Sequence, residues 1–68
     1  MTHKSRKATY HGAYVRVIEL DGGYIVEQYN FLAGNWISAT TSLASSHEAY
    51  KHAVALAAAL LLKAVNDN

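Results

Sequence analysis

The sequence predicts an α+β fold, in which a three-stranded antiparallel meander is followed by one C-terminal helix packed on one face of the sheet (β-β-β-α). Three short runs rich in β-forming residues are separated by glycine-containing turns, which is typical of antiparallel strands. The last third of the chain has no Gly or Pro and is rich in Ala and Leu, which is typical of a helix. A length of 68 residues allows one small domain.

The first two expected strands are residues 13–20, AYVRVIEL, and residues 24–31, YIVEQYNF. The link between them begins Asp21-Gly22, and this pair favours a type I′ turn because both of its central residues need a positive φ. Such a turn places Arg16 opposite Glu27, a favourable cross-strand pair. The same register pairs Val17 with Val26, Ile18 with Ile25 and Tyr14 with Tyr29.

The third expected strand is residues 36–43, WISATTSL, after a turn signal at residues 32–35. If Ala33-Gly34 forms that turn, side-chain alternation gives the sheet two different faces. One face is small and aliphatic, which suits a packed helix: Val15, Val17, Val26, Ile37, Ala39 and Leu43, with Tyr24. The other face is aromatic with a few polar groups: Tyr14, Ile18, Leu20, Ile25, Tyr29, Phe31 and Trp36, interrupted by Arg16, Glu27, Ser38, Thr40 and Ser42. One helix can cover only one of them.

The helix is expected over residues 49–65, after a capping box made by Ser45 and Glu48. One apolar stripe suits the sheet: Ala49, Ala53, Leu56, Ala57 and Leu60. A second stripe has little polar surface behind it, and we expect it to form an oligomer interface: Tyr50, Val54, Leu61 and Val65. The uninterrupted apolar run spans only residues 53–62, too short for a membrane span of roughly 20 residues. We therefore expect no membrane contact.

Half of the six basic residues lie in the first seven positions, as Lys4, Arg6 and Lys7. Residues 1–9 are therefore expected to form a flexible basic arm, and residues 10–68 a single β-β-β-α domain. The chain carries a net charge of +1, but the part after residue 7 has three bases and five acids, a net charge of −2. A domain that grips phosphates over its whole face carries many more Lys and Arg residues.

Size and composition predict self-association. A domain of about 60 residues buries only about 60% of its unfolded surface and is marginally stable without a disulfide, a metal or a partner. With no cysteine, disulfides are excluded, and a reducing, cytoplasmic location is the better expectation. We therefore expect the chain to bind further copies of itself and to form a small oligomer, such as a homodimer.

No residue pattern predicts catalysis. His47 and His52 are five positions apart, so they do not share a helix face as a pair of metal ligands would. The expected strands hold two acids, and one of them, Glu27, faces Arg16. The hydroxyl residues of the third strand have no histidine placed to activate them. We therefore expect no enzyme activity, no catalytic residue, no metal and no cofactor.

The aromatic face is the most informative feature, and Tyr14, Tyr29, Phe31 and Trp36 lie on it with Arg16. Tyr, Trp and Arg are enriched at protein hot spots, which favours binding to an as yet unidentified protein partner. The same rings could stack nucleic-acid bases beside Arg16. A third reading is that the two faces are inverted and that the aromatic face is the core, since a one-residue shift in the second turn would turn the third strand over.

Three strands followed by a helix that opens Ser45-x-x-Glu48-Ala49, with Ala53 and Ala57 on one face, resemble two families. These are the DNA-binding domains of plant ethylene-response factors and the arm-type domains of tyrosine integrases. The resemblance covers roughly residues 13–62. The resemblance implies a sheet whose Arg and Lys side chains read the DNA major groove. In this chain only Arg16 matches such a residue, and the acidic Glu27 lies beside it.

The sequence therefore predicts a non-catalytic protein-binding module that acts as a small oligomer. Short chains of this kind are common among phage and mobile-element accessory proteins, including inhibitors of host systems such as CRISPR, the anti-CRISPRs. The alternative is nucleic-acid binding through Lys4, Arg6, Lys7 and Arg16 together with the aromatic face.

Overall fold

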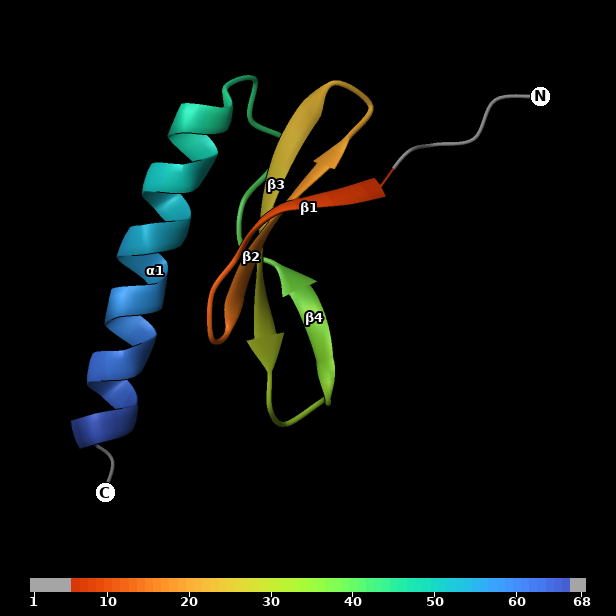
Figure 1. The fold of residues 1–68 in the computed structure, drawn as a ribbon. Helices are drawn as coiled ribbons and strands as arrows, with labels where there is room; N and C mark the ends of the chain where they lie inside the picture. Colours follow the sequence, from red (N-terminus) through yellow and green to blue (C-terminus); the bar gives the residue numbers. More distant parts are fainter. Residues whose placement is uncertain (1–5, 67–68) are drawn as a thin grey trace.

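A computed structural model describes residues 6–66, which form a four-stranded antiparallel sheet with a helix across one face (Figure 1). The strands are β1 (Arg6–His11), β2 (Val15–Leu20), β3 (Gly23–Asn30) and β4 (Asn35–Ser38), arranged in the order β1-β2-β3-β4. The helix α1 (Ser46–Asn66) follows them and packs over β2 and β3. The expected α+β class and the packed C-terminal helix are confirmed, with four strands where the sequence predicted three.

The additional strand corrects the expectation of a flexible arm over residues 1–9. Arg6–His11 pairs with β2, with a bulge between Ala8 and Tyr10, so residues 6–9 belong to the folded domain and not to an arm. The rest of the expected arm, residues 1–5, lies outside the described residues. Pairing is favoured because Tyr10 packs against the core and Arg6 makes an ion pair with Glu27. Lys4 lies outside the described residues.

The first hairpin has the expected turn and the expected register. Asp21 and Gly22 both have a positive φ, 54° and 78°, as a type I′ turn requires. Arg16 lies opposite Glu27, and the apolar pairs Val17 with Val26 and Ile18 with Ile25 also form. The Tyr29 N–H donates to the Tyr14 carbonyl at 2.9 Å, which continues the pairing past the start of β2.

The second hairpin has a longer loop than the sequence predicted. Residues 31–34 form it, Gly34 has φ 74°, and Tyr29 lies opposite Trp36. This register differs by two residues from that of an Ala33-Gly34 turn. Because side chains alternate with a period of two, Trp36, Ile37 and Ser38 keep their predicted faces.

The third predicted strand is shorter than residues 36–43, because β4 ends at Ser38. Beyond it, the Val26 N–H donates to the Thr40 hydroxyl at 3.2 Å, where a strand would offer a carbonyl. The chain then rejoins β3 at Leu43, which exchanges two backbone hydrogen bonds with Tyr24. Between Ser38 and Leu43 the Ala39 N–H donates to the Val26 carbonyl at 2.8 Å, so the segment stays beside β3 after β4 ends.

The core lies between α1 and the aliphatic face of the sheet, as predicted, but Ile37 and Ala39, which were expected on that face, are exposed and lie outside the core. Its fully buried members are Val15, Val17, Val26, Ala49 and Ala53. The two alanines allow the helix backbone to lie close to the valine side chains. At the start of α1, the Ser45 hydroxyl accepts a hydrogen bond from the Glu48 N–H at 3.3 Å, so the expected N-terminal cap forms. Within residues 6–66, no helix is long and apolar enough to span a bilayer.

Candidate protein-binding surface

The four aromatic residues expected on one face come together in a continuous row. The Tyr14 and Phe31 rings lie 4.8 Å apart, Phe31 and Tyr29 lie 5.2 Å apart, and Tyr29 and Trp36 lie 5.5 Å apart, measured between ring centroids. All three contacts are edge-to-face, the arrangement that the charge distribution of aromatic rings favours. We call Tyr14, Phe31, Tyr29 and Trp36 the aromatic row.

Arg16 joins this row to the charged part of the sheet. Its guanidinium carbon lies 4.2 Å from the centroid of the Trp36 ring, within the range of a cation–π contact. Its Nε donates to Glu27 Oε1 at 2.7 Å, so the side chain is held from two sides. Arg6 donates to the other oxygen, Glu27 Oε2, at 2.8 Å. One carboxylate thereby positions two guanidinium groups from β1 and β2.

The Glu27 carboxyl group is largely buried and ionised. Burial raises its pKa, but the hydrogen bonds from Arg6 and Arg16 and the attraction of their charges outweigh burial, so the pKa lies below its ordinary value. The ionised carboxylate accepts both hydrogen bonds and fixes the orientation of Arg16 over the indole ring. The charged cluster is therefore a rigid part of the sheet surface.

The members of the aromatic row differ in how much surface they offer. Tyr14, Tyr29 and Trp36 are half-buried, and one face of Trp36 is covered by Arg16. Phe31 is 66% exposed, and Leu32 beside it is fully exposed at the tip of the β3–β4 loop. At this end the row also borders α1, where a groove of about 260 Å³ lies against Leu60, Lys63 and Ala64.

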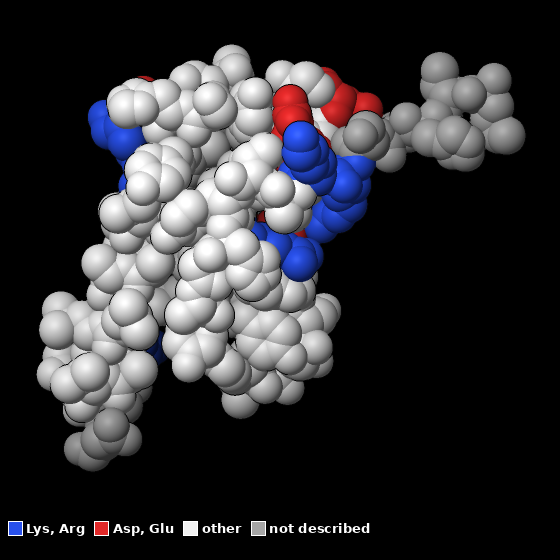
Figure 2. Space-filling model, viewed as in Figure 1, with Lys and Arg blue, Asp and Glu red and all other residues white. Residues whose placement is uncertain are grey.

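The stripe expected to form an oligomer interface is exposed along α1. Tyr50, Val54, Leu61 and Val65 are 51%, 41%, 50% and 69% exposed, respectively. Figure 2 shows the surface around the lower half of α1 and the β3–β4 end of the sheet as almost entirely uncharged in that view. The chain thus leaves on its surface the apolar side chains that the sequence analysis assigned to a second protein surface.

The basic residues proposed for nucleic acid are divided. Arg6 and Lys7 are exposed on β1, and Arg16 is half-buried on β2 beside them. In Figure 2 a group of basic side chains lies at the β1 side of the sheet, next to acidic ones, and further basic atoms lie over the upper part of α1. Arg6 and Arg16 both bind Glu27, so part of their charge is already balanced within the chain.

Two features of this surface were not predicted. The His11 ring lies 5.8 Å from the Trp36 ring and extends the aromatic row onto β1. The ion pair between Arg6 and Glu27 also depends on β1. The β-forming residues Thr9 and Tyr10 just before Gly12 are the sequence signal that could have revealed this strand.

Comparison of the chain with protein families, with curated proteins and with solved structures found no match. Among residues 6–66, the side chains that usually bind metal ions do not gather in groups of three or more.

Proposed function

We propose that this protein is a non-catalytic protein-binding module that acts as a small oligomer. The observation that carries the proposal is the geometry of Arg16, which Glu27 and Trp36 hold between them at the edge of the aromatic row. Arg, Trp and Tyr residues that are fixed in one conformation lose little entropy on binding and are the residues most enriched at protein hot spots. Tyr14, Arg16, Tyr29, Phe31 and Trp36 form the proposed partner-binding surface.

The same geometry favours a protein over a nucleic acid. A base-stacking platform needs the free face of an aromatic ring, but Arg16 already covers one face of Trp36, and Tyr29 and His11 both pack edge-to-face with the indole. Phosphate binding needs unbalanced cations, whereas Glu27 lies between Arg6 and Arg16. Such a surface suits a protein that packs against the row and bonds to the remaining guanidinium N–H groups.

Self-association would cover the exposed stripe of α1. Tyr50, Val54, Leu61 and Val65 recur at helical spacing along one side of the helix, which is how one helix packs against another. Each apolar side chain that is removed from water contributes about 25 cal/mol per Å² of buried surface. A second copy of the chain offers the same stripe, so a twofold arrangement would bury both stripes at once.

The alternative function is nucleic-acid binding through Arg6, Lys7, Arg16 and Lys4. It is favoured by one observation, that Arg6 and Lys7 lie exposed on the strand next to Arg16. The resemblance to sheet-type DNA-binding domains points the same way. Salt separates the two functions, because nucleic-acid affinity falls steeply between about 50 and 200 mM salt whereas an apolar protein interface responds little.

Affinity capture from a lysate of candidate host cells, followed by mass spectrometry, tests the proposed function. The immobilised protein should retain a specific protein at both salt concentrations, and Trp36→Ala should lose it. Ile37→Ala is the matched control, because Ile37 is the next residue of β4 and points to the other face of the sheet. Equal capture by both variants, or loss of the captured material on nuclease treatment, would contradict the proposal.

A more specific form of the proposal is that the partner belongs to a host system such as CRISPR and that the protein is a phage or mobile-element inhibitor. Small size and a surface built for binding are common in such inhibitors. Cells with an active CRISPR system that express this chain should then lose interference against a targeted plasmid. Cells that express Trp36→Ala should keep it. Full interference with the unaltered chain would exclude this form of the proposal.

A further inference from the structure

A second surface lies on the helix side of the sheet, in a groove between β1 and the first turns of α1. We infer that this groove receives an extended, acidic segment of a partner protein, which adds as a further strand to the free edge of β1. The site lies apart from the aromatic row, which is on the opposite face, and shares only Tyr50 with the exposed stripe of α1, so the inference goes beyond the proposed function.

β1 is an edge strand of the sheet. The strand order β1-β2-β3-β4 places β1 at an edge, with β2 on one side and no other strand of the described chain on its other side. The backbone N–H and C=O groups of an edge strand that point outward can pair with an added strand. In Figure 1, the N-terminal end of β1 points away from α1.

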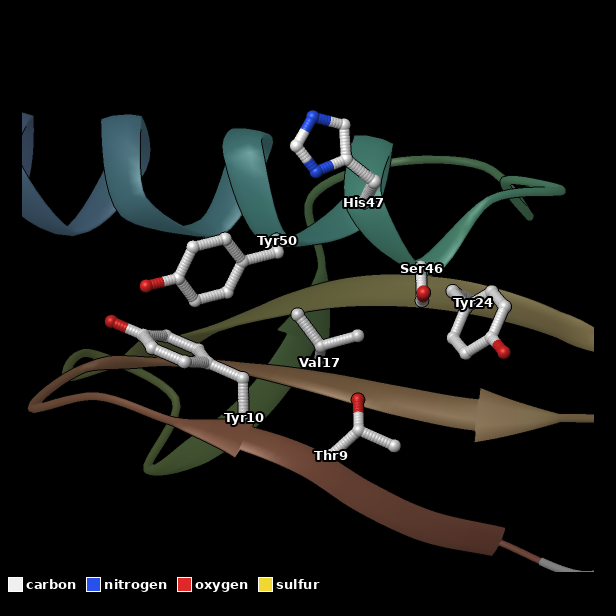
Figure 3. Close-up of a pocket in the computed structure, with 7 residues that line it drawn as sticks. All are labelled: Thr9, Tyr10, Val17, Tyr24, Ser46, His47 and Tyr50. Carbon is white, nitrogen blue, oxygen red and sulfur yellow. The ribbon is translucent and has the colours of Figure 1, made fainter.

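The groove beside β1 has a volume of about 510 Å³. Figure 3 shows Val17 at its floor, with Tyr10 and Tyr50 at one end and Tyr24 at the other. The Tyr10 and Tyr50 rings are 5.2 Å apart and nearly perpendicular, so β1 and α1 are linked there by an aromatic contact. A strand added to β1 would direct alternate side chains toward this groove, as the period of two requires.

The bulge in β1 shapes the groove. It falls between Ala8 and Tyr10, and Thr9 is the additional residue. A bulge re-aims the side chain that it contains, and in Figure 3 the Thr9 hydroxyl points toward the helix. The groove therefore combines an apolar floor with the hydroxyl groups of Thr9, Ser46 and the tyrosines, which suits a bulky apolar or aromatic side chain flanked by a peptide backbone.

Charge determines the kind of segment. The residues that line the groove include no Lys, Arg, Asp or Glu. The neighbouring β1 carries no acid and two bases, Lys7 and Arg6, and Glu27 balances part of the Arg6 charge. A second copy of β1 would bring like charges together, which disfavours pairing between copies of this strand. Glu19 lies opposite Lys7, but the outer side of Lys7 is exposed. An acidic segment complements this edge.

Peptide selection tests the inference. A display library of random nine-residue peptides is selected on the immobilised protein, and the enriched peptides are synthesised and titrated. We expect them to combine Asp or Glu with an apolar or aromatic residue.

Lys7→Glu should weaken the binding of these peptides at least tenfold. Lys7→Ala introduces no negative charge opposite Glu19, and it should also weaken binding. The matched control is Lys51→Glu, an equal charge reversal on the exposed side of α1, which should change binding less than twofold.

Hydrogen exchange and the NMR signals of the backbone amides show where the peptide binds. Binding should slow hydrogen exchange in residues 6–11 and shift the signals of residues 46–50. The inference is overturned if the selection enriches no peptide that binds the unaltered protein better than Thr9→Glu, a variant of the groove outside the stripe on α1. It is likewise overturned if Lys7→Glu and Lys51→Glu act alike, or if the shifts centre on Trp36. It is also overturned if a fifteen-nucleotide single-stranded DNA displaces the peptides, which would assign the edge to nucleic acid. Light scattering should show the same mass for Lys7→Glu as for the unaltered protein, because Lys7 lies outside the stripe on α1. A loss of peptide binding can therefore be distinguished from a loss of self-association.

Discussion

The guanidinium group of Arg16 packs on the indole ring of Trp36, with 4.2 Å between the guanidinium carbon and the ring centroid. The two residues belong to β2 and β4, and β3 lies between these strands. The contact therefore spans three strands of the sheet. Glu27, on the central one, fixes the other side of Arg16 through its carboxylate.

The first prediction concerns the energy of this contact. A cation–π pair at a partly exposed site contributes about 0.5 to 1 kcal/mol. We expect a double-mutant cycle with Arg16→Gln and Trp36→Leu to give a coupling free energy of that size in urea unfolding. Each single variant should remain folded by circular dichroism, because neither residue belongs to the buried core.

The control cycle pairs Arg16→Gln with Ile37→Ala, since Ile37 is next to Trp36 but faces the other side of the sheet. Its coupling should lie within about 0.3 kcal/mol of zero, as for independent sites. Equal coupling in both cycles would show that the free energy comes from general loosening of β4.

The second prediction concerns Glu27, which is the buried anion of the sheet. Glu27→Gln should reduce the free energy of unfolding at neutral pH by about 1 to 3 kcal/mol, because Arg16 loses a charged partner while it stays half-buried. The contribution of Arg6 is the smaller part, since its side chain is 49% exposed and its ion pair is screened by solvent.

The effect should depend on pH in one direction. The pKa of Glu27 is lower in the folded chain than in the unfolded chain, so its stabilisation is fully present above the unfolded pKa of about 4.3. It is lost as the pH falls through the lower, folded pKa. Urea unfolding at a series of pH values should therefore show the wild type and Glu27→Gln converging in acid. A constant difference between pH 7 and pH 2.5 would contradict the role given to the carboxylate.

The third prediction concerns Gly23, where the start of β3 meets the segment after β4. A β-carbon at this position would overlap the Ser42 hydroxyl oxygen, whereas the Ser42 β-carbon and the Leu43 carbonyl oxygen would both lie 3.5 Å away, at ordinary contact distance. Gly23→Ala should cost about 1 kcal/mol. The double variant with Ser42→Ala should recover most of that loss in chemical denaturation. If the double variant loses as much stability as Gly23→Ala alone, the loss comes from backbone strain at residue 23 and not from the contact with Ser42.

The sequence was sufficient for the elements whose signals are local. Asp21-Gly22 specifies the turn and hence the register of the first hairpin, and Ser45 marks the start of the helix. The assignment of the two sheet faces survived a loop of a different length, because the register of Trp36 changed by an even number of residues. Arg16 and Glu27 were paired correctly because the Asp21-Gly22 turn fixes the register of the first hairpin.

The remaining elements depend on tertiary contacts that no local pattern shows. Arg6–His11 looks like a polar arm because its charged residues hide the alternation, and it becomes a strand through Tyr10 in the core and Arg6 on Glu27. The early end of β4 depends on the Thr40 hydroxyl, which replaces a backbone acceptor for the Val26 N–H. The groove beside β1 follows from that strand and could not be predicted without it.

The fourth prediction concerns the exposed stripe of α1. A charge placed in a self-associating stripe must be buried without a partner, so Leu61→Glu and Val54→Glu should each convert the oligomer into a monomer.

Light scattering or sedimentation equilibrium measures the mass, and circular dichroism shows whether the helix persists. Ala59→Glu is the matched control, because Ala59 is exposed and its helical spacing places it on the opposite side of α1 from Leu61. It should leave the mass unchanged. Equal masses for Leu61→Glu and the wild type would remove α1 from the interface, because an uncompensated carboxylate there costs far more than a small dimer can absorb.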